Sequence, residues 1–172
     1  MSDGPAPAVT RFDPLVLAAA TRYQVPAALI RAIIHAESKP PGNPLSFNPE
    51  PGSPGGPSRG LMQIQEATAR GLGFTGRLDR LFDPATNIDL GTRLLRQLWD
   101  RFVGDVPAIV AAYNAGPRVV ARRTAAGFPN QRYVDDVLGL AERYGLVPMI
   151  VGPSLLLVVL LLLWWRSRKR SP

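Results

Sequence analysis

Apolar residues recur with a helical period along residues 1–145, and proline- or glycine-rich segments separate the predicted helices. Asp13-Pro14 and Asp83-Pro84 are typical helix starts, with an acidic N-cap followed by proline in the first turn. Pro26 and Asp105 open two further helices, and the second of these ends at Gly116-Pro117. We found no alternating polar and apolar run long enough for a strand. The pattern therefore predicts a mainly α fold.

Two more segments show the helical pattern, Leu61–Arg70 and a final segment that carries Tyr133, Val137, Leu140 and Tyr144 on one face. The segment Lys39–Arg59 is different, because it contains seven prolines and four glycines. Such a composition excludes a helix or a central strand and predicts a long loop.

Glu37 stands at an unusual place for a carboxylate. Leu29, Ile33 and Glu37 fall at i, i+4 and i+8, so Glu37 continues the apolar face of its helix and lies in the last turn. Burial and the helix dipole both raise the pKa of a carboxyl group there. An acid that keeps its proton near neutral pH is what glycoside cleavage requires. The structural alternative is a partly exposed glutamate that bonds to a backbone amide. His35 lies off this line, and we interpret it as structural or exposed.

Residues 146–165 form an uncharged stretch whose length matches a transmembrane helix. It ends in Trp164-Trp165, and the tail 166–172 adds four basic residues and no acid, as expected on the cytoplasmic side. A buried core helix or a helix lying on the membrane surface fits an all-apolar stretch less well. We therefore expect a membrane anchor, with residues 1–145 on the opposite side of the membrane.

Composition excludes several classes of site. The chain has no cysteine and one histidine, so neither a disulfide framework nor a zinc site built from thiolates or several histidines is possible. The net charge is +7, but the tail 166–172 supplies four of these charges and leaves +3 for the rest. The high pI is therefore mainly a property of the tail, and we expect no nucleic-acid binding. Residues 1–14 contain no apolar stretch typical of a signal peptide.

Four sequence blocks occur in a characteristic order: the pair Glu37-Ser38, then RGLMQIQEATA, LFDPATNIDLGTRLL and AIVAAYNAGPRVV. Together they resemble the lytic transglycosylases of the soluble-transglycosylase (SLT) type. The resemblance covers roughly residues 15–145 and implies a lysozyme-like α-helical domain with Pro/Gly-rich loops over residues 1–145. It also implies cleavage of the MurNAc–GlcNAc β-1,4 bond of peptidoglycan without a metal or organic cofactor.

The resemblance assigns roles to individual residues. Glu37 matches the family's single catalytic acid, with Ser38 beside it in the ES pair. The predicted substrate-binding positions are Ser38, Met62, Gln63, Tyr113, Asn114 and Tyr133. Each also has a structural alternative. Met62 and Ile64 fit a plain core, Tyr113 a buried aromatic with a satisfied hydroxyl, and Gly116 a helix stop.

The single acid implies a particular reaction. It protonates the glycosidic oxygen and then accepts the proton of the muramyl C6 hydroxyl as that oxygen attacks C1, which gives a 1,6-anhydromuramyl product. Two departures stand out: a lengthened Pro/Gly linker after Glu37, and Pro129-Asn130-Gln131 where the family has an acid and a threonine. Asn130 and Gln131 could still bond to sugar hydroxyls. The rival functions are a hydrolytic muramidase and a non-catalytic wall-docking module. The domain would act at the wall from a bacterial envelope or a virion membrane.

Overall fold

The computed structural model describes residues 6–49 and 56–146. The expected membrane helix 146–165 and the basic tail 166–172 therefore lie outside the described residues, apart from Leu146. Within the described ranges, every helix is too short or too polar to cross a bilayer.

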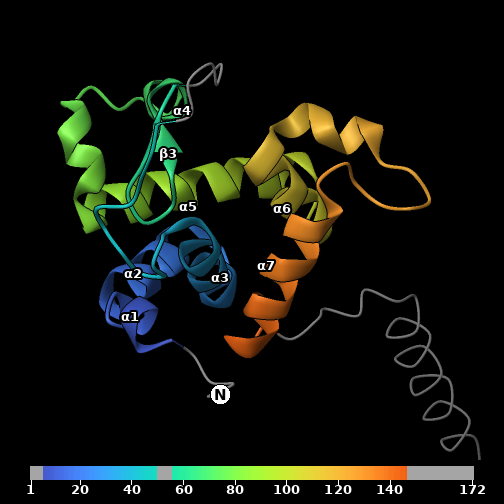
Figure 1. Cartoon of the computed structure of the whole chain (residues 1–172), viewed down its shortest axis with the longest axis horizontal. Coiled ribbons are helices and arrows are strands. Elements are labelled where there is room, and N and C mark those ends of the chain that lie inside the picture. The colour runs from blue at the N-terminus through green and yellow to red at the C-terminus, as the bar shows by residue number, and fades with distance from the viewer. Residues whose placement is uncertain (1–5, 50–55, 147–172) are drawn as a thin grey trace, which may run out of the picture.

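The described chain is mainly helical, as the apolar pattern predicted (Figure 1). Two short 3₁₀ helices, η1 and η2, were not predicted; they join longer helices. The helices in chain order are α1 (Pro7–Thr10), α2 (Asp13–Tyr23), α3 (Ala27–Glu37), α4 (Glu66–Gly71), η1 (Leu78–Phe82), α5 (Pro84–Arg101), α6 (Val106–Ala115), η2 (Pro117–Arg122) and α7 (Gln131–Arg143).

Two of the three predicted acidic N-caps are confirmed. The Asp83 carboxylate accepts from the Thr86 amide, and the Asp105 carboxylate accepts from the Ala108 amide. The prediction for Asp13 is wrong by one residue, because Phe12 occupies the N-cap position of α2. The carboxylate of Asp13 instead accepts from Arg31 Nε of α3 at 2.8 Å, so it ties two helices together.

A small antiparallel sheet was missed. Its strands are β1 (Phe47–Asn48), β2 (Ser58–Arg59) and β3 (Ile64–Gln65), in the order β1-β2-β3. The prediction that the proline-rich segment holds no central strand is therefore wrong, because β2 begins directly after its last proline. The predicted helix from residue 61 is also wrong in its first half. That half forms a turn and β3, and α4 begins only at Glu66.

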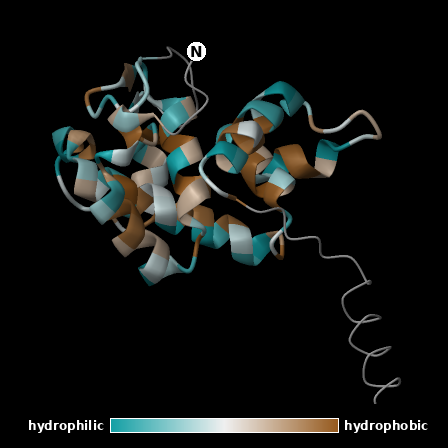
Figure 2. Ribbon diagram, turned by 90° about the horizontal axis from the view of Figure 1, so that it is seen from below, coloured by the Kyte–Doolittle hydropathy of each residue, from teal (hydrophilic) through white to brown (hydrophobic). Residues whose placement is uncertain are grey.

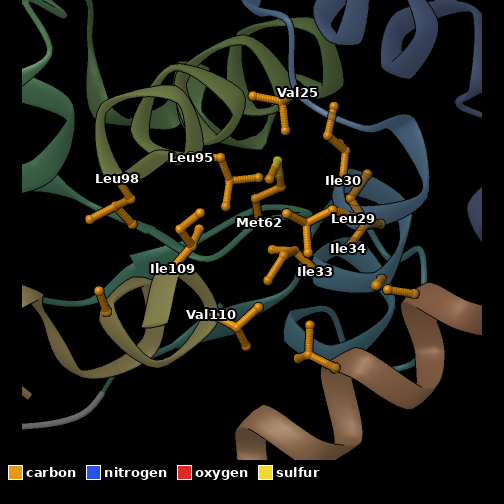
Figure 3. Packing of buried hydrophobic residues seen from close by; sticks show 14 of the residues in the cluster. Val25, Leu29, Ile30, Ile33, Ile34, Met62, Leu95, Leu98, Ile109 and Val110 are labelled. Atoms are coloured by element: carbon orange, nitrogen blue, oxygen red, sulfur yellow. The ribbon is translucent and has the colours of Figure 1, made fainter. Parts of the chain in front are cut away.

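The core forms around α3. This helix packs against α7, α2 and α1, and the long helix α5 packs against α2, η1 and α6 (Figure 1). Figure 3 shows Met62 among Leu29 and Ile33 of α3 and Leu95 of α5, all of which are fully buried. Burying one such aliphatic side chain contributes about 1.5–3 kcal/mol. The core therefore fixes both the end of α3 and the turn before β3.

Helix α7 completes the core from the C-terminal side. Its buried residues are Val134, Val137, Leu140 and Ala141, of which Val137 and Leu140 lie on the face expected from the sequence. Figure 2 shows that single helices carry both hydrophobic and hydrophilic residues, as expected for helices with one face in the core. The contact of α7 with α3 places Tyr133, in the first turn of α7, near the end of α3.

Candidate active site

Glu37 is the last residue of α3, and the chain leaves the helix at a buried serine. Ser38 is extended, with φ −88° and ψ 137°. Its hydroxyl donates to the Ile34 carbonyl at 2.5 Å and accepts from the Gly42 amide at 2.6 Å. Ser38 is completely buried. Its hydroxyl therefore satisfies backbone groups at the helix end and holds the following loop in place.

The carboxyl group of Glu37 is largely buried and has one side-chain partner in the described structure. Tyr133 donates its phenolic hydroxyl to Glu37 Oε1 at 2.5 Å. The sequence alternative, a glutamate bonded to a backbone amide, is not what the structure shows. Because the two residues come from α3 and α7, the packing of these helices sets the position of the acid.

The environment raises the pKa of Glu37. Burial is the largest cause, because it disfavours the charged form. The hydrogen bond from Tyr133 and the positive charge of Lys39 both oppose it by stabilising the carboxylate, yet the pKa stays above its ordinary value. Burial thus favours the protonated form of Glu37, and its two partners favour the ionised form.

Glu37 lines a cleft of about 610 Å³. Helix ends contribute Glu37, Asn114 and Tyr133, and the turn before β3 contributes Gln63. The segment after α3, up to β1, contributes further lining residues. Among the described residues that line the cleft, Glu37 is the one carboxylate. The full lining comprises Ala36, Glu37, Lys39, Asn43, Leu45, Ser46, Phe47, Asn48, Ser58, Gln63, Asn114 and Tyr133.

Gln63 connects the segments around the cleft. Its Nε2 donates to the carbonyls of Ser46 and Gly60, at 3.0 and 2.9 Å, and its Oε1 accepts from the Ser58 hydroxyl at 2.8 Å. Its φ of +48° is uncommon for a residue other than glycine. Since both ends of the amide are engaged, Gln63 braces the cleft wall that it lines.

Asn87 of α5 attaches the turn before β3 to that helix, and the sequence analysis did not identify it. Asn87 is buried, accepts from the Met62 amide at 2.7 Å, and donates to the carbonyls of Arg59 and Leu81 at 2.8 and 2.7 Å. Its side chain packs so closely on Gly60 that a Cβ there would lie 2.3 Å from Asn87 Nδ2. The sequence signal that could have identified Asn87 is its amide side chain among the buried apolar positions of α5.

The two tyrosines of the site are neutral hydrogen-bond donors. Tyr113 donates to the Met62 carbonyl at 2.8 Å, and Tyr133 donates to Glu37. Burial first, and then the nearby Glu37 carboxylate, raise the pKa of both hydroxyls well above the ordinary value. Both tyrosines therefore keep their protons throughout the physiological pH range.

Asn114 is oriented by the segment that departs from the family pattern. Asn130 donates through Nδ2 to the Ala111 carbonyl at 3.1 Å and to Asn114 Oδ1 at 2.9 Å. Because the oxygen of exposed Asn114 is engaged, its Nδ2 is the group left to bond to a ligand. Gln131 has a structural task instead. It accepts from the Phe128 amide and donates to Asp135, so both ends of its side chain are engaged at the start of α7.

The structure thus brings Glu37, Gln63, Asn114 and Tyr133 together around one cleft. Tyr113 is not among the residues that line the cleft, and its hydroxyl donates to the Met62 carbonyl, so its direct contact with a substrate stays a prediction. Ser38 and Met62 are completely buried and do not line the cleft, so direct contact of either with a substrate stays a prediction. Met62 packs in the core, as its structural alternative proposed. His35 is also structural, since its Nδ1 lies 3.0 Å from the Tyr144 hydroxyl.

Two curated proteins of similar sequence are named as transglycosylases. At 36% identity the chain matches "Membrane-bound lytic murein transglycosylase C" of Yersinia enterocolitica, over 65% of this chain and 33% of that protein. It matches "Transglycosylase" of Enterobacteria phage PRD1 with the same 36% identity, over 58% of this chain and 32% of that protein. The chain thus spans about a third of the length of these curated relatives.

Solved structures of lytic transglycosylases share the fold. An inactive mutant of the lytic transglycosylase Slt from Pseudomonas aeruginosa superposes with a TM-score of 0.63 and 26% identity, over 79% of this chain and 24% of that one. The 70 kDa soluble lytic transglycosylase SLT70 from Escherichia coli gives 0.60 and 28%, over 77% and 24%. The described fold is therefore the lysozyme-like fold of these enzymes. The family profile "Transglycosylase SLT domain" matches residues 14–131, and the chain belongs to this family.

Proposed function

We propose that the domain is a peptidoglycan lytic transglycosylase that cleaves the MurNAc–GlcNAc β-1,4 bond and leaves a 1,6-anhydromuramyl end. One observation carries the proposal: a partly buried Glu37 of raised pKa, bonded to Tyr133, is the one carboxylate among the described residues that line the cleft. Enzymes that use water commonly place a second carboxylate across the scissile bond. The named relatives support the same reaction class.

The cleft residues suit a reaction with one acid that acts twice. Protonated Glu37 donates to the glycosidic oxygen, and the C1–O bond breaks. The resulting carboxylate, stabilised by the hydroxyl of Tyr133, then accepts the proton of the C6 hydroxyl while that oxygen bonds to C1. The proton count balances, no water is consumed, and Glu37 ends protonated. Asn114 offers an amide donor to the sugar, in an orientation that Asn130 sets.

The product distinguishes this proposal from its two rivals. The full chain, in detergent, would digest purified peptidoglycan beside the Glu37→Gln variant, and mass spectrometry would identify the released muropeptides. Anhydro-ended products from the wild type alone are expected. Reducing-end products from the wild type alone would indicate a hydrolytic muramidase with the same acid. Binding without release by either protein would indicate a wall-docking module, and full activity of Glu37→Gln would refute the assignment of the acid.

We further propose that residues 146–165 anchor this domain in a membrane, with the cleft facing the cell wall. The support is the uncharged segment, the basic residues after it, and the words "membrane-bound" in the name of the Yersinia relative. The named phage relative keeps two settings open, a bacterial envelope and a virion. Fractionation should place the full chain with membranes, and detection in purified virions or in uninfected cells distinguishes the settings.

A further inference from the structure

The part of the cleft lining that follows α3 differs in chemical character from Gln63, Asn114 and Tyr133. It consists of the loop after α3, and it contains one cation, Lys39, among the described residues that line the cleft. Two exposed apolar side chains, Leu45 and Phe47, lie in the same part, with exposed fractions of 69% and 49%. Neutral sugar hydroxyls require no ammonium group, so a positive charge here indicates an anionic part of the ligand.

The backbone of Lys39 is fixed while its side chain is exposed. The Lys39 amide donates to the buried Ser46 hydroxyl at 3.1 Å, and the Lys39 carbonyl accepts from Asn43 at 3.1 Å. The preceding residue, Ser38, is anchored at both sides of its hydroxyl. The ammonium group therefore extends from a rigid point beside Glu37, which lowers the entropy lost when it binds a ligand.

The ammonium group is also unpaired within the described part of the chain. No described carboxylate lies within 4.0 Å of it, although six other ion pairs form among these residues. Its one clear electrostatic effect is unfavourable for acid catalysis, because it lowers the pKa of Glu37. A bound anion would neutralise this charge and restore the protonated acid when substrate is in place.

We propose that Lys39 binds a carboxylate on the lactyl-peptide substituent of the muramyl sugar and so selects anionic glycan strands. The inference rests on the proposed function, since it places a muramyl residue beside Glu37. The muramyl substituent supplies a carboxylate in two forms: on the peptide stem, or on the lactyl group once the peptide is removed. Leu45 and Phe47 are placed to cover the apolar parts of the same substituent.

Binding by the Glu37→Gln chain, which keeps the cleft but removes the acid, tests Lys39 independently of catalysis. Three probes are used: soluble peptide-bearing glycan strands, strands stripped by an amidase, and stripped strands whose lactyl carboxylates are converted to amides. Adding Lys39→Gln should weaken binding of carboxylate-bearing strands about tenfold, as expected for a lost charge-assisted hydrogen bond, and should leave the amidated strands unchanged. A loss for peptide-bearing strands alone assigns the stem carboxylate, and a loss for amidase-stripped strands alone assigns the free lactyl carboxylate. A loss for both shows that Lys39 accepts either carboxylate.

Two matched variants sharpen the test. Lys39→Arg should recover most of the binding, and Arg143→Gln should have no selective effect, because Arg143 is exposed at the far end of α7 and does not line the cleft. Equal effects of Lys39→Gln on all three probes, or none on any, would overturn the inference. If the wild type cleaves nothing while the selective loss persists, the proposed reaction is wrong and Lys39 belongs to a docking site.

Discussion

The buried amide of Asn87 should contribute more to stability than any other single polar side chain of α5. Asn87→Ala removes three hydrogen bonds at once, one to the Met62 amide and two to the carbonyls of Arg59 and Leu81. The alanine cannot replace them, and the packed surroundings leave little access for water at the Met62 and Leu81 groups. The turn that carries Gln63 would lose its attachment to α5.

The size of the effect follows from the groups left without partners. A buried donor or acceptor that loses its partner costs about 1–3 kcal/mol. Two of the three groups are buried and the third is partly buried. We expect a loss of about 3–5 kcal/mol in the free energy of unfolding, a large share of the roughly 5–15 kcal/mol typical of a domain.

Thr92 offers a matched control on the same helix. It is also completely buried, but its hydroxyl has no hydrogen-bond partner among the described residues. Thr92→Val removes that hydroxyl at nearly constant shape, so it should leave stability unchanged or raise it by up to about 1 kcal/mol. Urea unfolding followed by circular dichroism measures both variants. A loss below about 1 kcal/mol for Asn87→Ala, or equal losses for both, would refute this reasoning.

Three further predictions concern the acid and the core. Tyr133→Phe removes the hydrogen bond that stabilises the Glu37 carboxylate, so the pKa of Glu37 should rise further and the alkaline limb of the pH–rate profile should move to higher pH; an unmoved limb would contradict this. Because the folded-state pKa of Glu37 is raised, wild-type stability relative to Glu37→Gln should be highest below the unfolded-state pKa and fall as pH rises through the folded-state pKa, as unfolding at several pH values would show. Gly91→Ala should cost about 1–3 kcal/mol in unfolding free energy, because its Cβ would lie 2.4 Å from Met62 Sδ and 2.9 Å from Met62 Cβ. Gly139→Ala, with no atom within 4 Å, should gain about 0.5–1 kcal/mol, and the opposite order of melting temperatures would contradict both expectations.

The position of the acid was predictable from local pattern, and its partner was not. The spacing of Leu29, Ile33 and Glu37 along one helix indicated a buried carboxyl at a helix end; in the structure Glu37 ends α3 and is partly buried, and burial is the largest cause of its raised pKa. Tyr133 is 96 residues away, and no local pattern reveals which hydroxyl a buried acid will meet. The family resemblance placed Tyr133 in the site, but the hydrogen bond itself follows from the packing of α3 on α7.

The errors have physical reasons of the same kind. Strands of two residues are too short to show alternation, so β1, β2 and β3 gave no signal. Asp13 resembled an N-cap, but its carboxylate forms an ion pair with Arg31 of another helix, and the helix begins one residue earlier than expected. Asn87 was overlooked because its three partners lie in other segments. Local propensity reveals helices, while tertiary contacts decide what polar side chains do.

The hydrogen bond between Glu37 and Tyr133 also makes assembly of the site depend on the docking of α7 against α3. Glu37 and Tyr133 lie 96 residues apart in the sequence, and their bond forms only when α7 docks on α3. A nascent chain that ends before α7 would carry Glu37 without Tyr133, so the proposed activity would be absent while the chain is synthesised. The same division suggests a split enzyme. Two fragments, separated within the loop that precedes α7, would each be inert and would regain wall-cleaving activity only on reassociation, which makes lysis a reporter of their encounter.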